Sequence, residues 1–119
     1  MKKPVSPKAH GIIDYVFSGV QMAAPLLLNL NPATKKTYAA LSTGFTIVNA
    51  LTDTKVGMKR MIPFTGHQKA DIGFLAGLGA LSFVSFIRND KSARLFHLAI
   101  LGLAITNYLL TDYKQSPEQ

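Results

Sequence analysis

The sequence predicts an all-α fold with four transmembrane helices, arranged as two tandem helical hairpins that pack as a pseudo-two-fold bundle. The prediction starts from an internal duplication: His10 and Asp14 begin one apolar segment, and His67 and Asp71 begin another. The ends of the two halves also match, with Leu-Thr-Asp closing each after Gly44-x-x-Ile47-x-Asn49-x-Leu51 and Gly102-x-x-Ile105-x-Asn107-x-Leu109. A repeat at an offset of about 57 to 58 positions indicates two copies of one supersecondary unit.

The chain is expected to form one membrane domain, residues 1–119, with hairpin repeats at about residues 6–57 and 63–114. Helix start signals divide each repeat into two helices, because Ser, Asn, Thr and Asp favour the N-cap and Pro favours the first turn. The four helices are expected from Ser6-Pro7 to about Leu30, from Asn31-Pro32 to about Asp53, from Thr65 to about Ile87, and from Asp90 or Ser92 to about Tyr113.

Composition limits the chemistry that the chain can perform. It contains no Cys, which excludes disulfides, thiolate metal sites, cysteine nucleophiles and covalent haem attachment. Thirteen basic residues against six acidic ones suggest an anionic partner. The basic residues stand in short clusters between long apolar stretches, rather than in a stripe with interleaved aromatics. This placement favours a lipid surface and argues against nucleic acid.

The polar residues of the first two helices favour a membrane environment over water. They lie on one narrow stripe of each helix, and the rest of the surface is apolar, whereas a soluble bundle has a broad polar face. The stripe residues are Asp14, Ser18, Gln21 and Pro25 in the first helix and Ser42, Thr46, Asn49 and Asp53 in the second.

The chain is expected to be a multi-pass protein of the bacterial inner membrane with both termini in the cytoplasm. Lys2-Lys3 is followed by prolines and not by a short apolar region with a cleavage site, so the first helix is read as a retained span. The positive-inside rule sets the orientation. Eight basic residues on the terminal side exceed five on the other: Lys2, Lys3, Lys8, Lys55, Lys59, Arg60, Lys69 and Lys114 against Lys35, Lys36, Arg88, Lys91 and Arg94.

Several short motifs between about residues 8 and 113 occur in a characteristic order: His10-Gly11-x-x-Asp14-Tyr15, Leu51-Thr52-Asp53-x-Lys55-x-Gly57, Arg60-x-Ile62-Pro63 and His67-x-x-x-Asp71. In this order they resemble the bacterial SPW-repeat membrane proteins. The Ser-Pro-Trp signature appears here only as Ala24-Pro25-Leu26. The resemblance implies a small four-helix integral membrane protein and brings no catalytic residues.

The repeated His and Asp residues are expected to lie in one layer at the cytoplasmic side. The favoured interpretation is an interfacial hydrogen-bond network of His10, Asp14, His67 and Asp71 with Asn49, Asn107, Asp53 and Asp112. One alternative is a site for Zn, Fe or Mn with the two His and two Asp as ligands. Another is a proton or ion route through Asp14, Gln21, Ser42, Thr46 and Asn49. His97 has no counterpart in the repeat and is expected to be an interfacial or core residue.

The sequence contains no recognisable motif for an enzyme, and no catalytic residue or cofactor is expected. The leading hypothesis is a non-enzymatic structural or interaction module, and the alternative is an ion-, proton- or metal-handling membrane protein. The expected partners are the lipid bilayer and a second copy or another membrane protein. Gly73-x-x-x-Gly77 is a candidate contact for a homodimer, or for packing the third helix against the first.

Overall fold

The computed structural model describes residues 2–116 and contains helices but no β-strand in that range. Four long helices, α1 (Pro7–Leu27), α2 (Pro32–Ala50), α3 (Phe64–Leu81) and α5 (Lys91–Leu110), are accompanied by the single turn α4 (Ser85–Arg88). The expectation of an all-helical bundle is therefore confirmed.

The N-caps of three long helices are the residues expected from the sequence. The side chains of Ser6, Asn31 and Asp90 accept hydrogen bonds from backbone N–H groups three residues later, at 3.2, 2.8 and 3.2 Å. Each bond satisfies a donor that the first turn would otherwise leave free. The third helix differs, because it begins at Phe64 with Pro63 as its N-cap and not at Thr65.

The helix ends come earlier than the sequence analysis expects. The first helix ends at Leu27, and Asn29 reverses the chain in the left-handed region with φ 49°, a conformation that Asn tolerates better than most residues. The second and fourth expected helices end at Ala50 and Leu110. The third ends at Leu81 and not near Ile87, because i→i+3 backbone bonds tighten its last turn and Val84 is extended.

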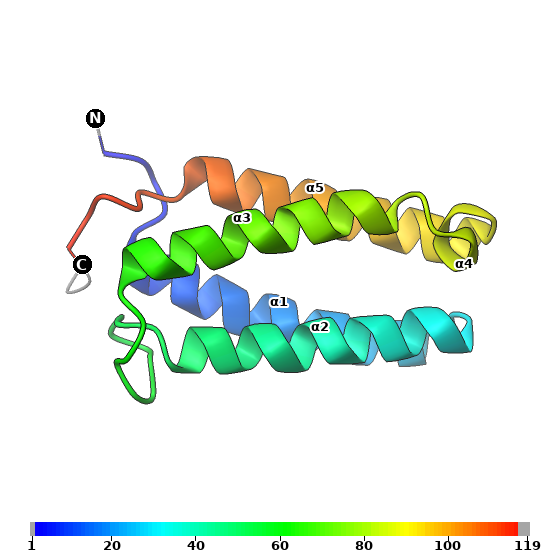
Figure 1. Ribbon diagram of the computed structural model, residues 1–119, viewed down its shortest axis with the longest axis horizontal. Helices are drawn as coiled ribbons and strands as arrows, with labels where there is room; N and C mark the ends of the chain where they lie inside the picture. The colour runs from blue at the N-terminus through cyan, green and yellow to red at the C-terminus, as the bar shows by residue number, and fades with distance from the viewer. Residues whose placement is uncertain (1, 117–119) are drawn as a thin grey trace.

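Figure 1 shows the two hairpins, α1 with α2 and α3 with α5, lying side by side. Both termini and the loop between α2 and α3 lie at one end of the molecule, and α4 lies at the other. Isolated parallel β-bridges join Val5 to Thr111 and Thr52 to Ile62 at the first end. These bridges occupy equivalent places in the two repeats, so this end of the bundle has approximate two-fold symmetry.

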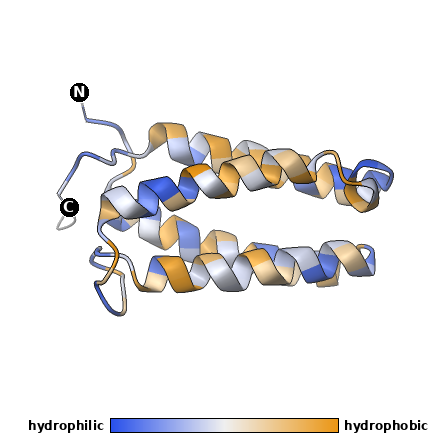
Figure 2. Cartoon of the chain, in the orientation of Figure 1, coloured by the Kyte–Doolittle hydropathy of each residue, from blue (hydrophilic) through white to orange (hydrophobic). Residues whose placement is uncertain are grey.

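Polar side chains occupy the interior of the bundle and large apolar side chains cover much of its surface. On α1, His10, Asp14, Ser18 and Gln21 are all at most 4 % exposed. The apolar core is small and consists of Tyr38, Leu78, Ile100 and Ala104 with their partly buried neighbours. Figure 2 shows apolar residues along the middle of the long helices and hydrophilic residues in the terminal segments and around α4.

By length and hydropathy alone, α5 is the one helix among residues 2–116 that qualifies as a candidate membrane span. The other three long helices do not reach the same hydropathy, so helix composition does not by itself support four transmembrane helices.

Candidate functional site

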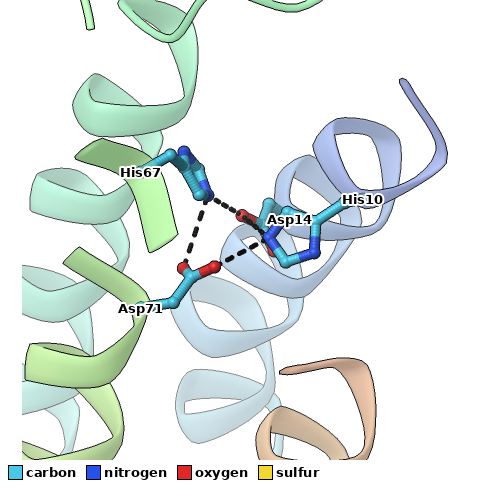
Figure 3. Close-up of side chains that lie close together, drawn as sticks. All are labelled: His10, Asp14, His67 and Asp71. Carbon is cyan, nitrogen blue, oxygen red and sulfur yellow. Dashed lines mark hydrogen bonds and ion pairs between the residues drawn. The ribbon is translucent and has the colours of Figure 1, made fainter. Parts of the chain in front are cut away.

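The four repeated side chains meet in a single buried cluster. His10 and Asp14 come from the first two turns of α1, and His67 and Asp71 from the equivalent turns of α3 (Figure 3). Residues four apart share a helix face, and α1 and α3 begin at the same end of the bundle. One nitrogen or oxygen atom from each residue lies within 4.8 Å of the others. The structure thus brings together all four predicted metal-ligating residues.

Each imidazole reaches both carboxylates through its Nε2 atom. His10 Nε2 lies 3.1 Å from Asp14 Oδ2 and 3.0 Å from Asp71 Oδ2. His67 Nε2 lies 2.9 Å from Asp14 Oδ2 and 3.3 Å from Asp71 Oδ1. Every His therefore contacts one Asp of its own helix and one of the other hairpin, and the cluster ties the hairpins together.

The Nδ1 atom of each His contacts a threonine of the opposite hairpin, His10 with Thr111 and His67 with Thr52, both at 2.7 Å. Each threonine hydroxyl donates its only proton to the carbonyl oxygen four residues earlier, at 2.6 Å in both cases. The hydroxyl must then accept a hydrogen bond from the imidazole. Both Nδ1 atoms therefore carry a proton.

This constraint decides what the two Nε2 atoms can do. Each faces the carboxylates either as the second N–H of an imidazolium ring or as a lone pair that binds a cation. The arrangement can accordingly hold two protons in an ion-paired network or one metal ion.

Two further side chains orient the carboxylates. Tyr113 donates a hydrogen bond from its hydroxyl to Asp71 Oδ2 at 2.6 Å, and Asn107 donates one to Asp14 Oδ1 at 3.3 Å. Burial and the neighbouring charge of Asp71 raise the pKa of Tyr113 far above its ordinary value, so it stays a donor. Tyr113 was not anticipated from the sequence, because it has no counterpart in the first repeat.

Asp53 and Asp112, which were expected in the same layer, and Asn49, which was expected in the same hydrogen-bond network, lie outside the cluster. The Asp53 carboxylate is 40 % exposed and lies 3.7 Å from Arg60. Asp112 accepts hydrogen bonds from the backbone of Lys3 and Lys114. The threonine of each Leu-Thr-Asp motif takes the inward place that was assigned to the aspartate. Asn49 is buried and donates to the Gly11 carbonyl oxygen at 2.8 Å.

The residues of the predicted ion route mainly hold α1 and α2 together. Ser42 donates a hydrogen bond to the Ser18 carbonyl oxygen at 2.6 Å, and Asn49 binds α1 in the same way, whereas Thr46 is only half-buried. A cavity of about 20 Å³ extends from Asp14 and Asp71 to Gln21. The Gln21 Oε1 atom is buried and has no hydrogen-bond partner.

His97 is a core residue at the other end of the bundle, as one of the two expectations had it. It is fully buried, and its Nδ1 accepts a hydrogen bond from the Tyr38 hydroxyl at 2.6 Å. Its Nε2–H donates to the carbonyl oxygen of Leu78 at 2.9 Å. This contact joins α2, α3 and α5 and is separate from the His/Asp cluster.

Gly73 and Gly77 do not pack α3 against α1, which was one of their two expected roles. A Cβ atom built at either position would have no neighbour within 4 Å, and both glycines are exposed. The other expected role, a contact with a second copy, stays a prediction.

No family model, no curated protein and no solved structure matches this chain.

Proposed function

We propose that this protein is a small integral membrane protein of the bacterial inner membrane and acts as a non-enzymatic structural or interaction module. In this proposal α1, α2, α3 and α5 each cross the bilayer. The observation that carries it is the inverted polarity of the bundle, in which the helix faces turned inward are polar and those turned outward are apolar.

Burial on α1 illustrates the inversion. Val16 is 63 % exposed and Leu27 is 85 % exposed, whereas His10 and Gln21 are each 1 % exposed. In water, each exposed aliphatic side chain would forgo about 1.5–3 kcal/mol of burial free energy. In a bilayer the same side chains face hydrocarbon, and the polar groups must turn inward to find partners.

The same inversion contributes to the low hydropathy of the three helices that are not candidate spans. In α1 the mean hydropathy is lowered by polar residues that are buried: His10, Asp14, Ser18 and Gln21. In α2 and α3 the buried Ser42, Asn49, His67 and Asp71 act in the same way, together with lysines that are not buried, Lys35, Lys36 and Lys69. The helices contain 21, 19, 18 and 20 residues. At about 1.5 Å per residue they approach the ~30 Å thickness of the hydrocarbon core.

Basic residues at both ends of the bundle support this orientation across a bilayer. Lys55, Lys59 and Arg60 lie in the loop beside the termini, and Arg88, Lys91 and Arg94 lie around the turn at α4. Both ends would meet lipid headgroups. The excess at the end with the termini favours placing the termini in the cytoplasm. The resemblance to SPW-repeat membrane proteins belongs to the same proposal.

Within this function the His/Asp cluster joins the two hairpins at one end of the bundle. Its four side chains, with Thr52 and Thr111, make hydrogen bonds and ion pairs across the hairpins. The convergence of the two imidazoles on two carboxylates also favours a second candidate, an ion-, proton- or metal-handling protein.

Membrane insertion is tested by expressing the chain with a histidine-free tag and extracting the membranes with alkaline carbonate. The protein should stay in the membrane pellet and require detergent for purification. Reporter fusions at both termini should be active only in the cytoplasm. A monodisperse monomer purified without detergent would overturn the proposal.

The second copy predicted from Gly73 and Gly77 is tested separately by crosslinking in native membranes. Because both glycines are exposed with open space around them, Gly77→Leu should weaken a dimer band without unfolding the chain. An unchanged band would exclude this face.

A further inference from the structure

We propose that His10, Asp14, His67 and Asp71 bind one divalent transition-metal ion of the Zn²⁺ class, with two imidazole nitrogens and two carboxylate oxygens as ligands. The inference goes beyond the proposed membrane function. It does not depend on membrane insertion either, because the cluster lies inside the helix bundle.

The protonation pattern of the two histidines suits a metal ligand. Thr52 and Thr111 donate their hydroxyl protons to backbone carbonyl oxygens. The Nδ1 atoms of His67 and His10, which contact these hydroxyls, must therefore be donors. A neutral imidazole with a proton on Nδ1 has a lone pair on Nε2. When the two rings are neutral, both Nε2 atoms present a lone pair to the carboxylates, and this is the tautomer that a metal ligand requires.

One of the two Nε2 atoms is buried without a hydrogen-bond partner. His10 is 1 % exposed, and its Nε2 atom makes no hydrogen bond of acceptable geometry. It nevertheless lies 3.0 and 3.1 Å from two carboxylate oxygens. An imidazolium N–H would be expected to align with one of them, whereas a lone pair aimed between them fits coordination of a shared cation.

The spacing of the ligand atoms is close to that of a metal site. In a tetrahedral site with bonds of about 2.0 Å, neighbouring ligand atoms are about 3.3 Å apart. The four nitrogen-to-oxygen distances are 3.1, 3.0, 2.9 and 3.3 Å, with Asp71 contributing Oδ2 to His10 and Oδ1 to His67. Taken with one atom from each residue, the four ligand atoms lie within 4.8 Å of one another. The nitrogen-to-oxygen pairs therefore already approach the separation that a four-coordinate ion needs.

The charge of the cluster is compatible with a divalent ion. Two carboxylates neutralise the ion, and two neutral imidazoles add no charge, so the occupied site has no net charge, as is also true of two imidazolium rings with two carboxylates. Both forms satisfy the requirement that buried charges be paired, and the distinction between them comes from the geometry of the Nε2 atoms.

The surroundings provide the support that metal sites need. Each His donates its other N–H to a threonine, Tyr113 donates to Asp71, and Asn107 donates to Asp14. Such outer contacts fix ring orientation and raise ligand basicity. The adjoining cavity of about 20 Å³ has room for a water-sized ligand and no larger molecule. The ion would thus link the hairpins and not act on a bulky substrate.

The test uses purified full-length protein with a histidine-free tag, stripped of metal and titrated with Co²⁺. We expect one equivalent to bind with the intense visible d–d absorption of a four-coordinate ion, and Zn²⁺ to displace it. Asp14→Asn should weaken Co²⁺ binding about tenfold or more, and Thr52→Val about 10–100-fold. His97→Gln is the matched control, because it removes a buried histidine outside the cluster and should leave binding unchanged.

Helicity measured by circular dichroism accompanies every titration, so that unfolding is not mistaken for ligand loss. A helical wild-type protein that binds no Co²⁺, or binds it with only the weak spectrum of a six-coordinate ion, would overturn the proposal in favour of an ion-paired network. Cobalt binding that persists unchanged in His10→Gln/His67→Gln would do the same. Carbonate extraction reports on membrane insertion independently, so failure of one proposal is distinguishable from failure of the other.

Discussion

The two hairpins are alike where they meet and different where each packs on itself. At the end with the termini, His10 contacts Thr111 and His67 contacts Thr52 at the same 2.7 Å. Within the hairpins the equivalence is lost. In hairpin one, Asn49 of α2 donates to the backbone of α1, but its counterpart Asn107 donates to the Asp14 carboxylate.

Packing of the loop against the start of the first helix also differs between the hairpins. A Cβ atom at Gly11 would lie 2.5 Å from Val56 Cγ2, so glycine allows the loop after α2 to approach α1. The equivalent position in α3 is Gln68, whose side chain reaches the Tyr108 hydroxyl at 3.3 Å. The repeated His, Asp and Thr residues of the cluster keep equivalent partners across the pseudo-two-fold axis, whereas Asn49 and Asn107, although also repeated, have different partners. Residues that pack inside one hairpin are free to differ.

The largest effect is expected where a cluster member loses its counterpart. Asp14→Ala leaves two buried imidazoles with one carboxylate and should destabilise the protein by about 3–5 kcal/mol. Asp71→Ala should behave similarly, because the cluster is pseudo-symmetric. His10→Ala/Asp14→Ala leaves His67 paired with Asp71 and should cost less than Asp14→Ala alone. Thermal unfolding in detergent with a chelator measures all three, and equal melting of every variant and wild type would contradict a stabilising cluster.

A smaller effect is expected from the donor that lacks a counterpart in hairpin one. Tyr113→Phe removes a 2.6 Å hydrogen bond to Asp71 and should cost about 1.5–3 kcal/mol, the range for hydrogen bonds to charged groups. Tyr108→Phe is the control, since Tyr108 accepts only the long bond from Gln68. Denaturant unfolding of both variants compares them, and the prediction is wrong if Tyr108→Phe is the more damaging.

Close approach in hairpin one is tested at two glycines of α1. Gly11→Leu should cost about 1–3 kcal/mol, because overpacking displaces Val56 and the loop around it. Gly19→Leu should have little effect, because nothing lies within 4 Å of a Cβ at that position. The two melting temperatures, measured side by side, decide this point, and similar losses at both sites would refute it.

The smallest effect is expected at Asp53. Its partly exposed ion pair with Arg60 is 3.7 Å long, and such pairs contribute about 0–1 kcal/mol. Asp53→Asn should therefore melt close to wild type and bind Co²⁺ normally. If Asp53→Asn lowered the melting temperature as much as Asp14→Ala, Asp53 would belong to the cluster, as was expected from the sequence.

The sequence by itself determined the helical repeat, three of the four N-caps and the pairing of His10/Asp14 with His67/Asp71. These features depend on local rules. A side chain one turn further along a helix lies on the same face, and a capping residue acts within three positions. A duplicated sequence then places equivalent residues at equivalent ends of the bundle.

Only the tertiary structure decided which residues complete the cluster. After α5 the chain becomes extended at Thr111, with φ −81° and ψ 132°, and it is held by the bridge to Val5. In extended backbone, successive side chains point in opposite directions. Thr111 and Tyr113 consequently face inward and Asp112 faces outward. The bridge of Thr52 with Ile62 has the same consequence for Asp53. These directions are set by pairing of the backbone with another segment, at the opposite end of the chain for Thr111 and across the loop between α2 and α3 for Thr52. The local pattern of residues around each Leu-Thr-Asp motif does not encode this pairing.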